Sequence, residues 1–476
     1  MRSYFTALAK AGYNVTVLDT SNAKLKQYGC NIVVEQAYVP VEQAGRVEAI
    51  TRFLTKTYNG FSLSGAQKNG NDNMLDIIDQ RWETLYRVIH TSYDLVVIDD
   101  IPCVHCSVIA SALNKMHNTK IILFSTTKPL EYNFILLGLV KSPVTNPYIF
   151  TFMPKINIDI MDFKNIKHRI HNLKLWFYEM YEFLTTDESR VVSSHKEFGQ
   201  TAFSWTSLFQ NIGLHVVESV DENVWPVPTH NFIKHTGLTC NPSSSNSTKP
   251  IPRDLLQFME DTTSKGTIYI AFGSYIDFTY APEHLHYALV NGIQRLSDYR
   301  VIVSVKINNT YIPKLPFVRY VDWAPQKEIL QHYSTKVFLT HGGLKSIKEA
   351  ICSKVSIVIM PLFAEQSANA HMILKSKIGR ILNKFTVDEK TFATELKTVA
   401  SATDYKNNIK NLYELWSERP MSHLEQVVFM TKRYDKVDSK SWNKYLQPQS
   451  KRLPTYCTYL VDVIGVVLIF IAVVSY

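Results

Sequence analysis

The residues best suited to chemistry gather around a glycine pair in the second half of the chain. Gly342 and Gly343 follow an apolar run at 337–340 and precede a helix expected to begin near Leu344. A helix start exposes unpaired N–H groups and the positive end of the helix dipole, so anions bind there. Glycine lets the backbone approach a phosphate without a Cβ in the way. Polar and aromatic side chains stand on both sides of this turn: Trp323, Gln326, His341, Glu349, Glu365 and Gln366.

A glycine turn alone is a weak indication, because many α/β proteins use one for packing. The order of the surrounding residues is more specific. The stretches WAPQ and HGGLKSIKEAIC…MPLFAEQ resemble the donor-binding signature of the UDP-glycosyltransferases, the UDP-glucuronosyl and UDP-glucosyl group, and are most similar to nematode members. The resemblance extends from about Ala9 to the end of the chain and is strongest between residues 266 and 383.

The resemblance implies roles for the residues that would hold the nucleoside of a UDP-sugar. Trp323 stacks near the uracil, and Gln326 hydrogen-bonds the edge of that base. Glu349, about two helical turns after the glycine pair, holds the ribose hydroxyls. This expectation competes with a simpler reading in which Glu349 is a surface residue of its helix.

The resemblance also implies how the diphosphate is bound. His341 contacts it together with the N–H groups of Gly342 and Gly343, and a second phosphate contact comes from Gly273 and Ser274 after the first strand of the second half. His341 alone would read equally well as a capping residue. Five such elements in order and at the family spacing are hard to obtain from packing.

The sugar end of the donor is assigned to the last two residues of the signature. Glu365 and Gln366 read the sugar hydroxyls, although Glu365 alone would read as an exposed surface residue. Lys345 stands where many family members, notably plant and vertebrate ones, have Asn. A lysine here resembles the nematode pattern and either adds charge near the phosphates or is a solvated helix residue.

A second candidate centre lies in the first half, where an acidic pair ends an apolar run. Sugar transfer to a hydroxyl needs a base that takes the proton as the oxygen attacks the anomeric carbon. Histidine suits that role near neutral pH, and a carboxylate orients and stabilises its charged form. The resemblance places this carboxylate directly after the strand expected at 93–98, at Asp99, with Asp100 as the second choice. Aspartate is otherwise a common helix cap.

The histidine partner is assigned to no residue of this chain. His105 and His117 lie in the same half, yet neither matches the family motif. The family pattern places a strand, and a loop that ends in the catalytic histidine, directly before the residues that match 3–8. The chain therefore resembles a family member truncated at its start, with the first strand of its N-terminal domain missing.

The length and composition predict a folded protein of two domains. The chain has 476 residues, 46% apolar and 20% charged, which is too long for one ordinary core and too apolar for a disordered chain. Apolar strands alternate with helices, which argues for parallel sheets and two Rossmann-like domains facing a cleft. The predicted boundaries are 1–225 for an acceptor-binding domain, 226–255 for a linker, 256–450 for a UDP-sugar-binding domain and 458–476 for a membrane anchor.

The expected elements are clearer in the second half than in the first. First-half strands are predicted at 14–18, 31–35, 93–99 and 120–124, helices at 74–90 and 103–116, and a polar loop at 69–73. Residues 129–176 show no clean periodicity, and the resemblance places much of the variable acceptor site there. Second-half strands are predicted at 266–272, 300–305, 317–321, 337–340 and 357–360, with closing helices at 387–400, 405–416 and 422–432.

Charge and cysteine usage exclude several classes. The net charge is +9 at pH 7, but Lys and Arg are scattered without a dense run, which argues against a nucleic-acid-binding protein. Six cysteines in a chain this long do not form a disulfide-scaffold pattern. Cys103 and Cys106 form a C-x-x-C, and two thiols on a buried helix start are favoured over a zinc site or a redox pair.

The C-terminal residues are almost entirely apolar. YLVDVIGVVLIFIAVVSY at 459–476 is at the short end for a membrane span, with Asp462 near its beginning. We predict a single anchor. Lys451 and Arg452 before it would agree with a cytosolic protein by the positive-inside rule. The resemblance implies instead a catalytic part in the lumen of the endoplasmic reticulum, and we favour that side.

Together these features predict a GT-B-like glycosyltransferase. The resemblance implies inverting, metal-independent transfer of glucuronic acid or glucose from a UDP-sugar to a small lipophilic hydroxyl compound, as in conjugation and detoxification. The UDP-sugar is a co-substrate and no cofactor is expected. The alternative is a catalytically inactive, membrane-anchored homologue that binds UDP-sugar or acts as a partner subunit. Expected partners are the donor, the acceptor, the membrane and a homo- or hetero-oligomer, but no nucleic acid.

Overall fold

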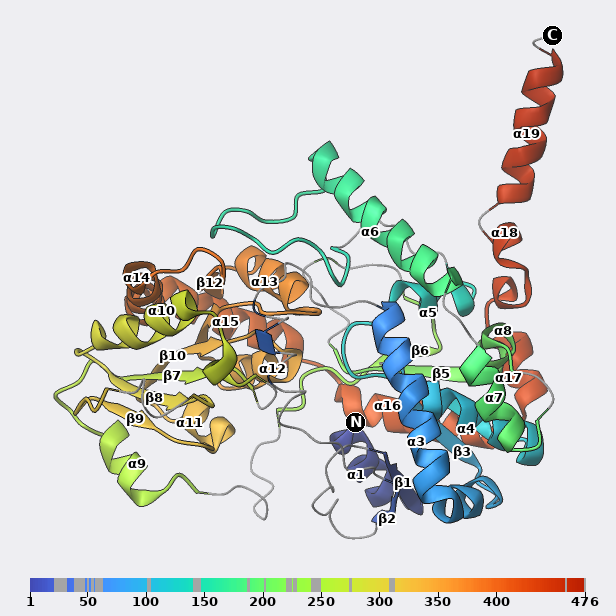
Figure 1. The fold of residues 1–476 in the computed structure, drawn as a ribbon, viewed down its shortest axis with the longest axis horizontal. Coiled ribbons are helices and arrows are strands. Elements are labelled where there is room, and N and C mark those ends of the chain that lie inside the picture. The colour runs from blue at the N-terminus through green and yellow to red at the C-terminus, as the bar shows by residue number, and fades with distance from the viewer. Residues whose placement is uncertain are drawn as a thin grey trace.

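Two parallel β-sheets, one in each half of the chain, carry the fold in the computed structural model (Figure 1). A third, two-stranded sheet pairs β1 (Val15–Asp19) with β2 (Ile32–Gln36) near the N-terminus. The structure describes residues 1–20, 32–37, 48, 51–52, 55, 63–100, 104–139, 147–185, 189–200, 203–219, 225, 229–240, 250–273, 276–307, 313–458 and 460–474.

The first-half sheet has four parallel strands in the order β3-β4-β5-β6. They are β3 (Leu95–Asp99), β4 (Lys120–Ser125), β5 (Ile212–Val217) and β6 (Ile233–His235). Successive side chains of β4 point to opposite faces. Ile121 and Leu123 join the core with α3 (Leu63–Ile89) and α4 (Val104–His117), whereas Ile122 and Phe124 join the core on the other face. This sheet is therefore buried on both sides.

The second-half sheet has six parallel strands in the order β12-β11-β10-β7-β8-β9. They are β7 (Thr267–Ala271), β8 (Arg300–Ser304), β9 (Val318–Tyr320), β10 (Thr335–Thr340), β11 (Ser356–Ile359) and β12 (Gly379–Ile381). Parallel sheets covered on both faces read as continuous apolar runs, and β7 alternates between two cores accordingly. Tyr269 faces one core, while Ile268 and Ile270 face the other.

Helices of the second half cover both faces of this sheet. α10 (Glu283–Gln294) and α14 (Glu389–Ser401) pack on one face. The other face is covered by five helices: α9 (Arg253–Met259), α11 (Gln326–Gln331), α12 (Leu344–Cys352), α13 (Gln366–Lys375) and α15 (Thr403–Ser417). This matches the doubly wound arrangement expected from strands that alternate with helices.

The last helices of the body return to the first half. α16 (His423–Lys436) and α17 (Ser439–Tyr445) share a core with α1 (Arg2–Lys10) and the first-half sheet. The Trp442 indole donates a hydrogen bond of 2.8 Å to the Gly213 carbonyl, and the Tyr4 and Thr431 hydroxyls lie 2.7 Å apart. The sequence pattern assigns the helix at 422–432 to the second half, whereas α16 packs on the first-half sheet. Its apolar face is complementary to β5, and periodicity alone does not show which sheet such a face covers.

A first-half segment crosses in the opposite direction. Met153 and Met161 lie in the core of the second half. The Met161 N–H donates to His371 Nδ1 at 3.1 Å, and His371 Nε2 donates to the Phe152 carbonyl at 2.9 Å. Asn157 accepts from the Ile381 N–H at 2.8 Å. The two halves are therefore tied together by segments exchanged in both directions.

The rest of the first half contains helices that the sequence pattern left open. They are α5 (Glu131–Leu136), α6 (Ile166–Thr185), α7 (Ser189–Glu197) and α8 (Trp205–Asn211). The polar loop predicted at 69–73 is wrong, because these residues lie inside α3, whose backbone is interrupted instead at Arg81. The linker predicted at 226–255 contains β6, the fourth strand of the first-half sheet.

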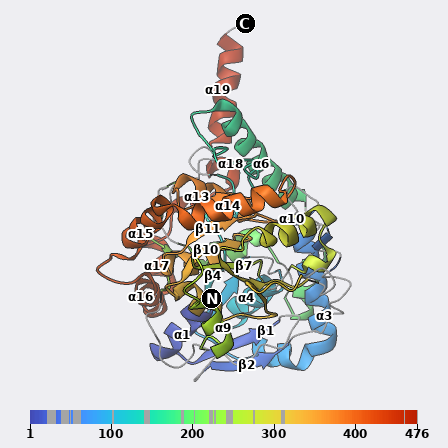
Figure 2. The same cartoon turned by 90° about the vertical axis from the view of Figure 1, so that its left-hand side faces the viewer.

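The chain ends in short helices and one projecting helix. These are η3 (Gln449–Arg452), α18 (Thr455–Thr458) and α19 (Val461–Val474), and α19 stands away from the body in both views (Figures 1 and 2). Within the described residues, no helix is both long enough and apolar enough to cross a membrane. The transmembrane helix predicted at 458–476 is therefore not found, since α19 has 14 residues and a span needs roughly 20.

Disulfides correct the expectation from the cysteine count. Cys240 is bonded to Cys352 with a Cα–Cα distance of 5.3 Å, which ties the segment after β6 to the last residue of α12. Cys106 is also disulfide-bonded, so the prediction of two buried thiols at Cys103 and Cys106 is wrong for Cys106. Cys103 lies outside the described residues. Cysteine spacing in a long chain gives no connectivity, which explains the failure.

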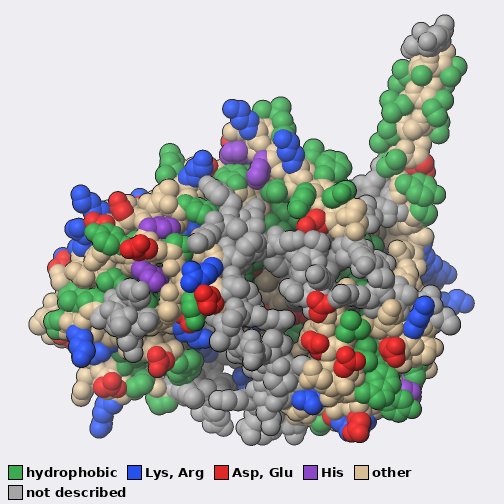
Figure 3. Space-filling view, in the orientation of Figure 1, with side chains coloured by type: hydrophobic (Ala, Val, Ile, Leu, Met, Phe, Trp, Pro, Cys, Tyr) green, Lys and Arg blue, Asp and Glu red, His purple; other side chains and the backbone are tan. Residues whose placement is uncertain are grey.

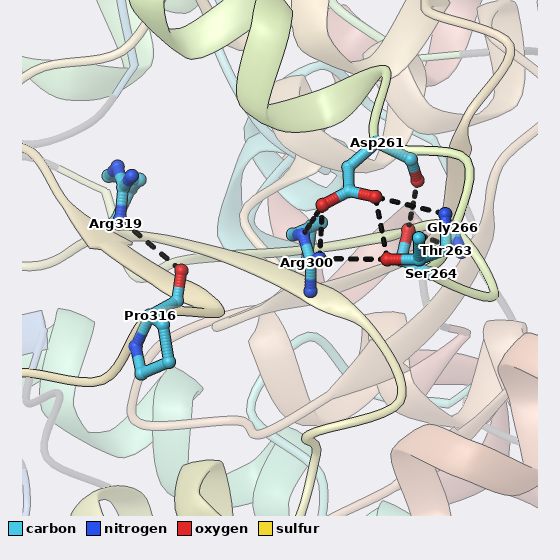
Figure 4. A network of polar contacts seen from close by, with 7 residues as sticks. All are labelled: Asp261, Thr263, Ser264, Gly266, Arg300, Pro316 and Arg319. Carbon is cyan, nitrogen blue, oxygen red and sulfur yellow. Dashed lines mark hydrogen bonds and ion pairs between the residues drawn. The ribbon is translucent and has the colours of Figure 1, made fainter.

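An ion pair fixes the amino-terminal edge of the second-half sheet (Figure 4). Arg300, the first residue of β8, donates to the Asp261 carboxylate from Nε at 3.1 Å and also from a terminal nitrogen. Asp261 accepts two more hydrogen bonds from Thr263, from its N–H at 2.9 Å and its hydroxyl at 2.7 Å. The hydrogen bond from Arg300 is the main reason why the pKa of Asp261 falls to about 2.

Removing the Cys240–Cys352 bond is expected to lower stability and loosen α12. Replacing both cysteines with serine should lower Tm under oxidising conditions by the equivalent of about 2–4 kcal/mol, because the bond closes a long loop in the unfolded chain. Scanning calorimetry of the variant and of Cys457→Ser, which removes a free thiol, measures this. Equal Tm values for the two variants would contradict the expectation.

The Asp261–Arg300 pair is expected to stabilise the fold in a pH-dependent way. The pKa of Asp261 in the folded protein is about 2, below the ordinary value of 3.8. The stabilisation is therefore present above pH 4 and is lost as the pH falls toward 2. At pH 6, Asp261→Asn should unfold at a lower urea concentration than wild type. The difference between their midpoint concentrations should be smaller at pH 3. Asp298→Asn, which breaks the more exposed pair with Lys265, is the control and should have a smaller effect. A pH-independent difference for Asp261→Asn would count against this.

Candidate functional site

The candidate site is built where three adjacent parallel strands end. Thr340, the last residue of β10, lies opposite Ala271 of β7 and Ile359 of β11. The residues that follow these strands therefore emerge side by side at the carboxyl edge, where open α/β sheets bind ligands. Gly273 follows β7 and His341 follows β10, and a Cβ built on Gly273 would lie 3.0 Å from the His341 ring. Ser274 lies outside the described residues.

The glycine turn after β10 has the conformation that its sequence requires. Gly342 has a φ of +90°, and a Cβ there would lie 2.2 Å from Ile359 Cδ1. The Gly342 N–H donates to the Thr340 hydroxyl at 3.3 Å, and the Asn369 side chain donates to the Gly342 carbonyl at 2.9 Å. Gly343 is the N-cap of α12 and has no side chain to cap the helix, but the Glu365 carboxylate accepts a hydrogen bond from the Leu344 N–H. The start of α12 therefore already donates to one carboxylate, as expected of a helix start that suits an anionic partner.

His341 stands beside these N–H groups as a neutral imidazole. Burial lowers its pKa to about 4. A Cβ on Gly343 would lie 2.7 Å from His341 Nε2, so only glycine allows the ring this close to the start of α12. At neutral pH the side chain is a hydrogen-bonding group and carries no charge.

Gln326 and Glu349 form a pre-organised pair between α11 and α12. The Gln326 amide donates to Glu349 Oε2 at 2.7 Å and to the Ser346 hydroxyl at 3.3 Å. Burial raises the pKa of Glu349, while the hydrogen bond from Gln326 opposes that shift. Trp323, two residues before the proline that precedes α11, is 64% exposed. An exposed indole next to a held amide and carboxylate suits a planar base and a pair of hydroxyls.

Glu365 and Gln366, predicted to read the sugar, differ in their surroundings. Burial raises the pKa of Glu365, and Lys128 from the first half is among the charges that act on it. Gln366 is 2% exposed, and its Oε1 accepts from the N–H groups of Leu362 and Phe363 at 2.8 and 3.1 Å. The Gln366 carbonyl oxygen is therefore already used by the loop, which leaves its amide nitrogen as the group that could reach a hydroxyl.

The acidic pair of the first half divides into one accessible and one buried carboxyl group. Asp99 ends β3 and is half-buried, and its Oδ1 accepts from the Thr126 hydroxyl at 3.3 Å. Asp100 is buried and accepts from the Asn133 side chain at 2.7 Å and from the Ser125 hydroxyl. This arrangement favours Asp99 over Asp100 as the carboxylate that reaches a bound acceptor.

Asp100 belongs to a buried network that sequence reasoning missed. The Ser125 hydroxyl that donates to Asp100 also lies 2.8 Å from His215 Nε2. Burial raises the pKa of Asp100 well above its usual range, and the nearby charge of Asp99 adds to that effect. Burial lowers the pKa of His215 to about 3. A Ser, Asn and His on three different elements carry no common sequence spacing, so only the fold reveals this network.

Charged groups from both halves act on one another near Glu218. Glu218, after β5, acts on Lys348 of α12, whose pKa is lowered to about 8, mainly by burial. The Met1 ammonium lies 2.9 Å from Glu218. Burial lowers the pKa of that ammonium, and the charges of Lys345 and Asp99 also act on it. Charges from the start of α12 and from the end of β3 therefore act on the same ammonium group.

The structure brings most of the predicted site residues to one edge. Those of the second half lie on α12 or near its start, or are held to it: Gly273, Gln326, His341, Gly342, Gly343, Glu349, Glu365 and Gln366. Trp323 precedes Gln326 by three residues. Asp99 lies in the first half, at the end of β3. His117 donates to the Ile89 carbonyl at 2.9 Å and is a structural residue. The roles of the predicted site residues toward a ligand stay predictions from the resemblance. Lys128 and Lys348 are charged neighbours of this group that the motif did not identify.

The chain matches one family model along its whole length. The model is described as UDP-glucoronosyl and UDP-glucosyl transferase and matches residues 1–476. A putative UDP-glucuronosyltransferase, ugt-50, of Caenorhabditis elegans is 24% identical over 375 residues, which cover 78% of this chain and 68% of the relative. Human UDP-glucuronosyltransferase 1A9 is 22% identical over 505 residues, which cover 100% of this chain and 87% of the relative.

Solved glycosyltransferase structures share the fold. Os79 from O. sativa in complex with UDP superposes with a TM-score of 0.56 at 15% identity, covering 91% of this chain and 96% of that chain. UGT71G1 of Medicago truncatula complexed with UDP-glucose gives a TM-score of 0.59 at 15% identity, covering 91% and 94%. The similarity shows that the two parallel-sheet halves have a GT-B-like arrangement.

Glu349 is expected to control nucleotide affinity. Glu349→Ala removes an acceptor that is already held by Gln326, so UDP binding should weaken about 10- to 100-fold, the usual range for losing a hydrogen bond to a charged group. Isothermal titration with UDP measures the change. Glu283→Ala, which changes an exposed residue at the start of α10 in the same half, should bind as wild type does. Unchanged UDP affinity in Glu349→Ala would contradict the assignment.

Proposed function

The chain belongs to the UDP-glucoronosyl and UDP-glucosyl transferase family, and on that premise we propose how its geometry performs sugar transfer. It is a hexosyltransferase that takes a sugar from a UDP-sugar. The proposal concerns the acceptor, the roles of single residues and the place where the reaction occurs. The acceptor is a small lipophilic hydroxyl compound, and the donor sugar is glucuronic acid or glucose.

The observation that carries the proposal is the held pair of Gln326 and Glu349, of which Glu349 lies on α12, the helix whose start follows the glycine turn. The pair offers fixed hydrogen-bonding groups to a nucleoside, and the exposed indole of Trp323 comes three residues before Gln326. About one and a half helical turns away, the N–H groups after Gly342 offer donors to a diphosphate. The distance from Glu349 to the helix start spans about one and a half turns, or about 8 Å, which suits the separation of a ribose from its β-phosphate.

The reaction proceeds as a single displacement. The acceptor oxygen attacks the anomeric carbon, the bond from that carbon to the diphosphate oxygen breaks, and UDP leaves with the electron pair. The hydroxyl proton passes to a base that we assign to no described residue, and Asp99 supplies the carboxylate that would stabilise the protonated base. The N–H groups at the start of α12 stabilise the charge that develops on the leaving diphosphate. Attack from the face opposite to UDP inverts the configuration, and no step is assigned to a metal.

The test is a transfer assay with both donors. Purified full-length protein is incubated with radiolabelled UDP-glucuronic acid or UDP-glucose and a panel of phenols and lipophilic alcohols, with and without EDTA. Product whose anomeric configuration is opposite to that of the donor supports the proposal. UDP binding without transfer to any acceptor would favour the alternative, a homologue that binds the nucleotide and acts as a partner subunit.

The place of reaction is proposed as the lumen of the endoplasmic reticulum. The Cys240–Cys352 bond and the bonded Cys106 support this, because disulfides persist in oxidising compartments. Protease protection of the chain in intact microsomes tests it. The anchor at 458–476, membrane topology and oligomeric state stay predictions.

Asp99 is expected to act on turnover and not on donor binding. Asp99→Asn should lower kcat about 100- to 10,000-fold, the range for a group in acid–base catalysis, and leave the Kd for UDP unchanged. Asp94→Asn is the matched control, because Asp94 precedes the same strand at its exposed, opposite end. Steady-state kinetics and UDP titration check this. Equal kcat values for Asp99→Asn and Asp94→Asn would remove Asp99 from the mechanism.

A further inference from the structure

One lysine side chain of the second half is completely buried. Figure 3 shows Lys and Arg side chains on the outside of the molecule, where their charge is solvated. Lys384, in the segment between β12 and α14, has instead an exposed fraction of 0%. Burial lowers the pKa of its ammonium group to about 7. Burying an ammonium group costs free energy unless other groups bind it, so the groups that bind Lys384 indicate its role.

The Lys384 ammonium group binds the loop that leads to the residues predicted to read the sugar. We call residues 361–365, between β11 and α13, the sugar loop. Lys384 donates a hydrogen bond to the main-chain carbonyl of Leu362 in this loop. Hydrogen bonds from a charged donor are roughly twice as strong as those between neutral groups. The Leu362 N–H donates to Gln366 Oε1 at 2.8 Å, so Leu362 is held through both of its main-chain polar groups.

The backbone of the sugar loop is strained two residues after Leu362. Ala364 has a φ of +52°, a left-handed conformation that a residue with a Cβ rarely adopts. Such a conformation persists only where surrounding contacts hold it, and it is common at ligand sites. It directly precedes Glu365, whose carboxylate accepts a hydrogen bond from the Leu344 N–H. The contacts at Leu362 are therefore placed to hold the strained turn that orients Glu365.

The segment that carries Lys384 is itself fixed to the second-half sheet. The Leu382 N–H donates to the Ile359 carbonyl at 2.8 Å, which continues the pairing of β11 with β12. His284 Nε2, on α10, donates to the Lys384 carbonyl at 2.7 Å. Because its main chain is held by a strand and a helix, the Lys384 ammonium group is a fixed point to which the sugar loop is attached.

We propose that Lys384 is a positioning residue that sets the selectivity of the protein for the sugar of its donor. It holds the sugar loop in the strained conformation that presents Glu365 to the sugar hydroxyls. Because its side chain is fully buried, it acts through the loop and does not touch the donor. This role rests on the proposed function, in which Glu365 reads the sugar. A purely structural lysine would affect stability and leave the selectivity among UDP-sugars unchanged.

Titration calorimetry of Lys384→Met in the full chain tests this role. Methionine removes the ammonium group and keeps most of the side-chain length. Kd values are measured for UDP, UDP-glucose, UDP-galactose and UDP-glucuronic acid. The ratio between the weakest and the tightest UDP-sugar should fall about tenfold, as expected from losing a hydrogen bond to a charged group, while the Kd for UDP should not change. An unchanged ratio would overturn the role of Lys384.

The titration separates this role from the proposed function, because it needs no acceptor and no turnover. Wild-type protein that binds no UDP would overturn the proposed function, and the role of Lys384 with it. Wild-type protein that binds UDP and all three UDP-sugars equally would overturn the role of Lys384 alone, since no selectivity would exist for it to set.

Lys451→Met is the matched control for the loss of a buried lysine. Lys451 is 4% exposed, and the pKa of its ammonium group is lowered to about 7, mainly by burial. It also donates to a main-chain carbonyl, that of Ile212 in β5, and to Gln447 Oε1 at 2.9 Å. Lys451→Met should lower Tm as Lys384→Met does but keep the wild-type selectivity among UDP-sugars. Equal losses of selectivity in the two variants would show a general effect of lost stability and contradict the proposal.

Relieving the strain at residue 364 should offset the loss of Lys384. Glycine adopts a positive φ without steric cost, so Ala364→Gly combined with Lys384→Met should recover part of the lost selectivity. Hydrogen exchange of the amides at 362–365 should be faster in Lys384→Met than in wild type and slower again in the double variant. Lys384→Gln replaces Lys384→Met in both comparisons if the methionine variant does not fold. A double variant that recovers neither selectivity nor protection from exchange would refute the positioning role.

Discussion

The parallel pairing of β10 with β7 and β11 is the constraint on which the candidate site depends. Because Thr340 lies opposite both Ala271 and Ile359, the turns after these strands are forced into contact. The His341 ring can then contact residue 273 only because that residue is glycine and has no Cβ. The positive φ of Gly342 brings its backbone against Ile359. Shifting one strand by a residue would exchange its core and surface faces and separate these groups. The register of these strands is therefore the reason why glycine is required at positions 273 and 342.

The second requirement is that the two halves keep a defined relation, because the donor residues and Asp99 belong to different sheets. The chain meets it by exchanging segments. Met161 and Asn157 of the first half bond to His371 and Ile381 of the second, while Trp442 returns to Gly213 of the first. Each contact buries polar groups with satisfied hydrogen bonds, so moving the halves apart would expose or orphan them. The halves are therefore not joined by one linker alone.

Sequence reasoning succeeded where local pattern and fold agree, and failed where long-range contacts decide. β10, the glycine turn and α12 follow from an apolar run, two glycines and a helical pattern that are adjacent in the chain. Residues 69–73 have turn composition, yet α3 continues through them because its face packs on α4. The commitment of the Gln366 oxygen to Leu362 and Phe363, and the partners of Asp100, depend on loops and strands that only folding brings together.

The donor side and the acid–base side of the site depend on different interactions, which explains why the donor side is easier to predict from the sequence. The donor side is made by main-chain geometry and by one pre-formed amide–carboxylate contact, so its residue types and their spacing are fixed together. The acid–base side depends on a single half-buried carboxylate, Asp99, next to a carboxyl group that burial keeps protonated to unusually high pH. Asp100 is bonded to Ser125 and Asn133 and so fixes the end of β3 beside Asp99. Two neighbouring carboxylates resist ionising together, and the charge of Asp99 is one of the causes of the raised pKa of Asp100.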